Sequence, residues 1–175
     1  MSDLLQGNIS SLAEFLAHAL ELEAESAERY RELADNMQVH NNPEVAALFL
    51  ELAAEGEAHL KQVQQMAAAF ELPEIAPWAF KWSCPDGPES LAMDNIRYLM
   101  TRRQALLLAS HNEVLGRDFY VQVAEHSENP EVAQLARDMA LEEDAHVRML
   151  QAWLDEEKKE PLAPLSDLDP PNMPE

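Results

Sequence analysis

The sequence predicts an all-α protein, a four-helix bundle made of two copies of a helix pair. Hydrophobic residues make up 47% of the 175 residues and glycine occurs only 4 times, which is a composition typical of long helices. Apolar residues recur at steps of three and four along most of the chain, which indicates amphipathic helices. Residues 42–59 also match residues 129–146 without gaps, so the helix pair is internally duplicated.

The first two helices have recognisable starts. Ser11-Leu12-Ala13-Glu14 has the form of a capping box, so the first helix is expected to begin near Ser11 and to end at the turn of residues 40–42. The second helix is expected to begin with Asn42 as its cap and Pro43 in its first turn.

Prolines and glycine interrupt the helical pattern over residues 71–88, which we interpret as a long connection between the second and third helices. A link of this length lets the chain cross the bundle. Aromatic residues alternate within it, at Trp78, Phe80 and Trp82, and favour an ordered connection that lies on the bundle.

The third helix is expected from about Ser90 to Ser127, with a bend or break before Thr101-Arg102-Arg103. The fourth is expected to begin with Asn129 as cap and to end before Pro161. Residues 161–175 are acidic and rich in proline, so we expect a mobile tail after a bundle of residues 1–160.

The charge and the cysteine count exclude several classes of function. The formal charge of −21 repels phosphate backbones and anionic lipid, so neither nucleic acid nor a membrane is an expected partner. A single cysteine, Cys84, allows no internal disulfide and no CxxC metal site. No segment approaches the ~20 apolar residues of a membrane span, and no signal peptide is apparent, so the expected location is the cytoplasm.

Five charged or imidazole side chains interrupt the apolar stripes of the four predicted helices. Glu23 and Glu113 occupy the first and third helices, and each precedes a tyrosine by seven residues. Residues three apart share a helix face, so Glu143 and His146 point inward together on the fourth helix. The inward set is Glu23, His59, Glu113, Glu143 and His146.

Such a set needs a compensating positive charge. A buried carboxylate without a partner costs several kcal/mol, and the arginines of these helices fall off the inner stripes. Divalent metal ions supply the charge, and mixed carboxylate and imidazole ligation suits iron or manganese. We expect Tyr30 and Tyr120 to be core aromatics whose hydroxyls need an acceptor, with a bond to a ligand carboxylate as the functional alternative. The remaining histidines are expected at the surface, with His111 a weaker candidate for supporting a ligand: His18, His40, His111 and His126.

These motifs resemble the rubrerythrin-like branch of the ferritin-like superfamily. The resemblance covers about residues 11–155 and rests on Glu23-x6-Tyr30, Glu113-x6-Tyr120 and Glu143-x-x-His146. It implies a ferritin-like four-helix bundle that holds two iron ions through the five inward residues, with glutamates of the second and fourth helices as bridges. Manganese or zinc are alternative metals, and a homodimer is the expected assembly.

The sequence departs from the family pattern at one ligand position. Gly56 stands three residues before His59, where the family has a bridging glutamate. Glu55 and Glu57 are candidate substitute ligands. Otherwise the glycine leaves one coordination position open, or one of the two metal ions binds weakly. The chain also lacks the paired CxxC motifs of a rubredoxin module, so electrons would come from a separate donor protein or from the iron itself.

Three functions are compatible with this pattern. The resemblance favours a di-iron redox protein that reduces H2O2 or O2 as Fe(II) is oxidised. A metal-binding or partner-binding bundle with a degenerate site is the second, and a di-iron oxygenase acting on an organic substrate is the third.

Overall fold

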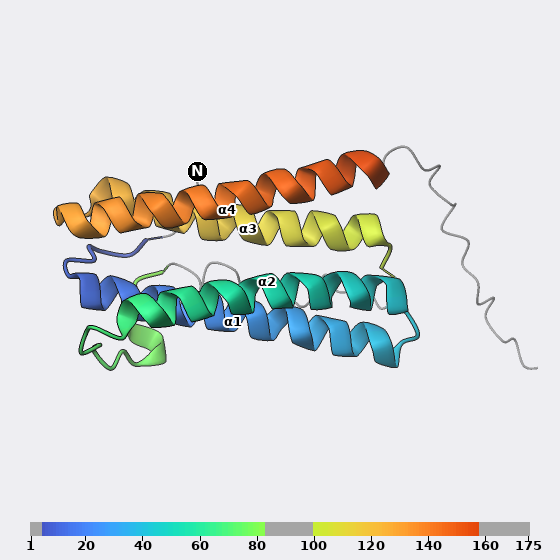
Figure 1. The fold of residues 1–175 in the computed structure, drawn as a ribbon, viewed down its shortest axis with the longest axis horizontal. Helices are drawn as coiled ribbons and strands as arrows, with labels where there is room; N and C mark the ends of the chain where they lie inside the picture. Colours follow the sequence, from blue (N-terminus) through green and yellow to red (C-terminus); the bar gives the residue numbers. More distant parts are fainter. Residues whose placement is uncertain (1–4, 83–99, 158–175) are drawn as a thin grey trace, which may run out of the picture.

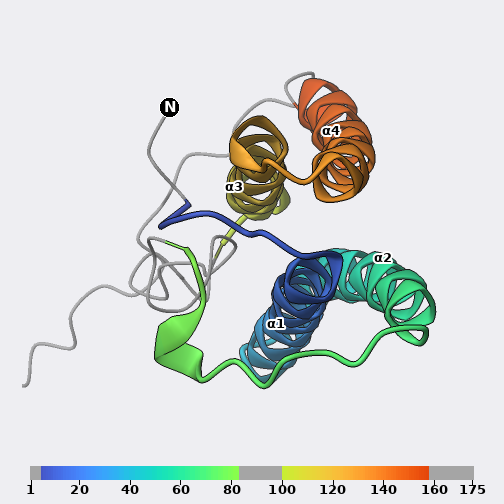
Figure 2. The same ribbon diagram turned by 90° about the vertical axis from the view of Figure 1, so that its left-hand side faces the viewer.

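The computed structural model describes residues 5–82 and 100–157 of the chain. These residues form four long α-helices and one 3-10 turn: α1 (Leu12–Val39), α2 (Pro43–Ala67), η1 (Pro77–Ala79), α3 (Arg102–His126) and α4 (Pro130–Glu157). Consecutive helices pair into two hairpins, α1 with α2 and α3 with α4, which lie against each other as two layers (Figure 1, Figure 2). The predicted all-α four-helix bundle is confirmed.

Two of the four helix starts follow the predicted cap residues. The Ser11 hydroxyl accepts the backbone N–H of Glu14, although the Glu14 carboxylate bonds to the N–H of Ser10 and so does not complete the capping box. The Asn129 side chain accepts the N–H of Glu131 at 3.0 Å, as expected for the cap of α4. Thr101 caps α3 directly after the expected break.

Asn42 behaves differently from its prediction as a side-chain cap. Its side chain makes no cap hydrogen bond to α2; the Nδ2 group donates to the carbonyl oxygen of Met100 at 2.8 Å. Asn42 therefore ties the turn between α1 and α2 to the chain entering α3. The part of the third helix expected from Ser90 to 99, and the tail expected from residue 161, lie outside the described residues.

The prediction that His18 is a surface residue is wrong. Its side chain is 1% exposed, because the connection after α2 folds back and covers this part of α1. The His18 Nε2 atom accepts the N–H of Lys81 at 3.0 Å, and its ring lies edge-on to the rings of Phe80 and Trp82. Of the described aromatic residues of this connection, Trp82 is buried and Phe80 packs against the core, whereas Trp78 is 88% exposed. The other three histidines expected at the surface are exposed: His40, His111 and His126.

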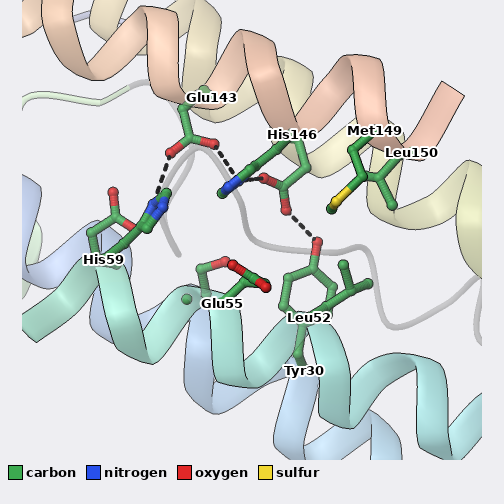
Figure 3. A pocket seen from close by; sticks show the side chains of 12 residues that line it. Tyr30, Leu52, Glu55, His59, Glu143, His146, Met149 and Leu150 are labelled. Carbon is green, nitrogen blue, oxygen red and sulfur yellow. Dashed lines mark hydrogen bonds and ion pairs between the residues drawn. The ribbon is translucent and has the colours of Figure 1, made fainter. Parts of the chain in front are cut away.

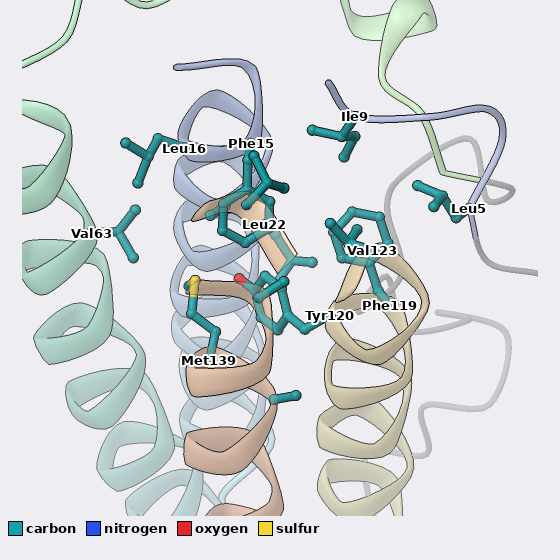
Figure 4. Packing of buried hydrophobic residues seen from close by; sticks show 14 of the residues in the cluster. Leu5, Ile9, Phe15, Leu16, Leu22, Val63, Phe119, Tyr120, Val123 and Met139 are labelled. Atoms are coloured by element: carbon teal, nitrogen blue, oxygen red, sulfur yellow. The ribbon is translucent and has the colours of Figure 1, made fainter. Parts of the chain in front are cut away.

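Two apolar clusters fill the bundle, one towards each end. The first includes Phe15, Leu22, Tyr120 and Met139, with all four helices contributing (Figure 4). The second is made of residues nearer the other end of each helix, and it includes Tyr30, Leu52, Ala109 and Leu150. The polar residues predicted to face inward lie between the two clusters along every helix.

No helix within residues 5–82 and 100–157 combines the length and the apolar character that a membrane span needs.

Candidate metal centre

The five predicted ligands meet in one layer of the bundle, each helix contributing at least one. They line a common cavity of about 20 Å³ between the two hairpins (Figure 3). The three carboxylates are nearly inaccessible: Glu23 and Glu143 are 3% exposed and Glu113 is 7% exposed. The side chains of His59 and His146 are 16% and 19% exposed, so the layer is most accessible on their side.

Glu143 lies between the two histidines. Its Oε1 atom is 3.8 Å from Nδ1 of His59, and its Oε2 atom is 3.7 Å from Nδ1 of His146. The two imidazole rings stack with their centroids 4.6 Å apart. Ligand atoms of these three residues lie within 4.8 Å of one another, close enough to hold a metal ion.

Each of the two remaining carboxylates lies close to one histidine. His59 Nδ1 is 3.8 Å from Oε2 of Glu23, and His146 Nδ1 is 3.2 Å from Oε2 of Glu113. Each hairpin thus supplies one pair of a glutamate and a histidine, and the second hairpin adds Glu143, which faces both pairs.

Two tyrosines connect the hairpins through these carboxylates. The Tyr30 hydroxyl of α1 donates to Oε1 of Glu113 on α3 at 2.8 Å. In the reverse direction, the Tyr120 hydroxyl of α3 donates to Oε1 of Glu23 on α1 at 2.9 Å. Each tyrosine fixes one oxygen of a carboxylate and leaves the other oxygen turned towards a histidine.

Burial strongly affects the proton affinity of the carboxylates. It raises the pKa of Glu143 well above the ordinary value of 4.5, and the neighbouring carboxylates of Glu23 and Glu113 raise it further. Burial also raises the pKa of Glu23 to about 7, although His59 and the Tyr120 hydroxyl act in the opposite direction. Burial alone would raise the pKa of Glu113 too. Hydrogen bonds from His146, Glu143 and Tyr30 outweigh this effect, so the pKa of Glu113 is lowered. The metal-free centre therefore keeps protons on buried carboxyl groups near neutral pH.

The donor set fits divalent cations. Within the described ranges, the ion pairs of Glu23, Glu113 and Glu143 are all made with His59 or His146. The arginines that the sequence placed off the inner stripes pair with other acids: Arg29 with Glu32, Arg31 with Glu57, Arg117 with Asp118 and Arg148 with Asp144. Three buried carboxylates with two imidazoles and no guanidinium form a site of mixed oxygen and nitrogen ligands for metal.

Gly56 lies on the cavity wall at a close contact between α1 and α2. A Cβ atom at position 56 would lie 3.3 Å from the Cβ of Ala27, so a side chain there would require a small shift of the helices. Of the two candidate substitute ligands, only Glu55 lines the cavity, where it reaches from α2 on the side opposite Glu143 (Figure 3). Glu57 is not brought to the centre, because its carboxylate pairs with Arg31 on the outer side of α1.

Other residues of the cavity were not singled out by the sequence reasoning. Ser26 is 5% exposed and lines the cavity, together with Leu52, Met149 and Leu150. Ser26 lies between Glu23 and Tyr30 at helical spacing, so the same periodicity that identified the glutamate also predicts an inward serine.

Comparisons with known proteins agree with the fold and the motifs. Residues 14–80 and 104–168 match the rubrerythrin family. The chain belongs to the rubrerythrin family. The family match leaves out residues 81–103, which lie between its two segments.

A solved structure also resembles this rubrerythrin-family chain. It is the crystal structure of an uncharacterised conserved protein from Magnetospirillum magnetotacticum MS-1, which is 42% identical. The similarity covers 83% of this chain and 95% of that chain, with a TM-score of 0.65. The comparison with curated proteins finds no match.

Proposed function

We propose that the chain is a non-haem di-iron redox protein that reduces hydrogen peroxide or O2 as Fe(II) is oxidised. The observation that carries this proposal is the placement of Glu143, whose two oxygens face His59 and His146 at nearly equal distances. Glu23 and His59 would hold one metal, Glu113 and His146 the other, and Glu143 both. Manganese or zinc are alternative occupants of this donor set.

When bound, a pair of Fe(II) ions supplies the two electrons that, with two protons, reduce H2O2 to two water molecules. The protein supplies the arrangement of the ligands. Tyr30 and Tyr120 orient Glu113 and Glu23, and the apolar clusters on either side keep the layer shielded from bulk water. A separate electron donor and a homodimeric assembly remain part of the proposal.

The size of the cavity favours a small oxidant over an organic substrate. The cavity measures about 20 Å³ and the metal ions themselves would occupy part of it, whereas pockets for organic ligands measure ~300 Å³ or more. This observation disfavours the oxygenase alternative. The degenerate-site alternative is favoured by Gly56, which removes one of the family's bridging carboxylates.

The test is to load the metal-free protein with Fe(II) without oxygen and to titrate it with H2O2 while recording the absorption spectrum. We expect ferric absorption to rise until one peroxide has been added for every two bound irons. Zinc-loaded protein is the matched control and should give no spectral change. Iron that stays ferrous in excess peroxide contradicts the redox function, and protein that retains no metal supports the degenerate bundle.

A further inference from the structure

Two aligned positions of the hairpins each pair a glycine with a polar residue. The repeat aligns Glu23 with Glu113 and Tyr30 with Tyr120, so Ser26 of α1 corresponds to Gly116 of α3. It likewise aligns Gly56 of α2 with Glu143 of α4. The first hairpin thus has a serine and a glycine at the positions where the second has a glycine and a glutamate.

The contacts of Gly56 explain how this exchange fits the bundle. A Cβ atom at position 56 would lie 3.3 Å from the Cβ of Ala27 and 3.5 Å from its nitrogen, the atom joined to the carbonyl of Ser26. The α2 backbone therefore runs against the peptide that links Ser26 to Ala27. Ser26 is buried and lines the same cavity as Gly56 and Glu143. Gly56 thus lets α2 approach α1 closely, and the cavity that it lines together with Ser26 and Glu143 lies beside this contact.

We propose that Ser26 is a positioning residue, whose hydroxyl hydrogen-bonds a small oxygen-bearing molecule or small anion on the Gly56 side of the cavity. This is the place where the repeat would put a second carboxylate facing Glu143. The inference rests on the proposed function and names the group that holds its oxidant. A hydroxyl can both donate and accept, so it suits neutral peroxide and anions, whereas an ionised carboxylate only accepts and would repel anions.

The test uses the ferric protein and azide as the probe, with binding followed by absorption. We expect Ser26→Ala to weaken azide binding by about five- to tenfold, the effect of losing one hydrogen bond, with the iron content unchanged. Ser26→Thr keeps the hydroxyl and should bind azide within about twofold of the unmodified protein. A purely structural role for Ser26 would move neither affinity.

The outcomes separate this proposal from the proposed function. Equal azide affinity in Ser26→Ala and the unmodified protein, at equal iron content, overturns the role of Ser26 and leaves the di-iron function standing. Absence of azide binding to the iron-loaded protein overturns it in the same way. Failure of the unmodified protein to bind iron overturns both.

A double variant provides a second, independent test. Ser26→Gly combined with Gly56→Glu copies the pair formed by Gly116 and Glu143 into the first hairpin. We expect this variant to retain its iron and to lose azide binding, because the new carboxylate occupies the place of the probe. Azide binding of unchanged strength in the iron-loaded double variant contradicts the proposed location.

Discussion

Each oxygen of the Glu143 carboxylate faces a different histidine, at 3.8 Å from His59 and 3.7 Å from His146. Glu23 and Glu113 each face one histidine only. Gly56 supplies no second carboxylate opposite, and Glu55, which lines the cavity there, is exposed, so under the proposed function Glu143 joins the two metal positions. Its removal should then affect both positions together.

We predict that Glu143→Ala lowers the affinity for both metals by more than about 100-fold, since loss of an outer partner of a ligand alone costs about 10–100-fold. Metal analysis after dialysis against a weak chelator provides the measurement. Glu142→Ala is the matched control, because Glu142 is the preceding acid of α4 and is exposed, with its carboxylate bonded to Gln62. Full metal occupancy in the Glu143 variant would show that this residue is not the bridge.

At the residue scale, helical periodicity predicted which side chains converge, but not which ones the connection would cover. The five inward residues and the two tyrosines were all identified from their places on apolar stripes. His18 was not, because its burial depends on Lys81 and Trp82, which come after α2 and follow no helical period. Ser26 was not predicted as a site residue, because a serine on an apolar stripe does not by itself indicate that it lines a cavity.

At the element scale, α3 depends on a cap at its first turn. The Thr101 hydroxyl accepts the N–H of Gln104 at 3.2 Å, and the Gln104 side chain accepts the N–H of Thr101 at 2.9 Å. This reciprocal pair satisfies two backbone donors that the start of a helix otherwise leaves unpaired. The helix that it begins carries Glu113 and Tyr120.

We predict that Thr101→Ala lowers the free energy of unfolding by about 1 kcal/mol, the usual cost of losing a cap. Urea denaturation of the metal-free protein, followed by circular dichroism, measures the change. Thr101→Ser keeps the hydroxyl and should restore most of the stability. An alanine variant as stable as the original protein would mean that the cap contributes nothing to α3.

A cap residue predicted from local sequence acts as a cap where its side-chain oxygen accepts from its own helix, even if its amide also bonds elsewhere, as Asn129 Nδ2 does to the carbonyl oxygen of Ser10. Ser11 and Asn129 act on their own helices, as expected. Asn42 precedes a proline in the same pattern as Asn129, yet its side chain bonds to Met100 in the other half of the chain. The residues around Asn42 could not predict this bond, because its acceptor lies 58 residues away in the sequence.

At the scale of the whole molecule, the buried carboxyl groups link stability to pH. Glu23 has a folded-state pKa of about 7 against an ordinary value of 4.5, and the pKa of Glu143 is also raised. Between about pH 4.5 and 7 the folded metal-free protein therefore binds more protons than the unfolded chain, and its stability falls as the pH rises. The lowered pKa of Glu113 acts only at more acidic pH, so it does not reverse this trend.

We predict that the metal-free protein loses on the order of 1–3 kcal/mol of stability through Glu23 between pH 5 and 7. Urea denaturation at the two pH values measures the loss, and Glu23→Gln should show a smaller one, because its amide does not titrate. The comparison separates the contribution of Glu23 to the pH dependence of stability from the repulsion among the other acidic side chains of a chain of charge −21. Metal affinity should rise over the same interval, since binding displaces the protons. An equal loss in the Glu23 variant would contradict the assignment.

The overall architecture could be predicted because the duplication and the helical periodicity both act over long segments. The arrangement of the hairpins relative to each other could not, because it depends on contacts between distant residues. The hydrogen bonds from Tyr30 to Glu113 and from Tyr120 to Glu23 join residues 83 and 97 positions apart. The sequence indicated that the tyrosines need acceptors but left the acceptors open.

The reciprocal tyrosine bonds have a consequence for how such a centre can vary. Two separate, identical hairpins could form the same crossed bonds around a twofold axis, but any substitution in one would appear in both. Such an assembly would carry either two glycines or two glutamates at the positions that Gly56 and Glu143 occupy here. Joining the hairpins in one polypeptide frees these positions from each other. Under the proposed function, one side can then join the metals while the other binds the molecule that reacts with them.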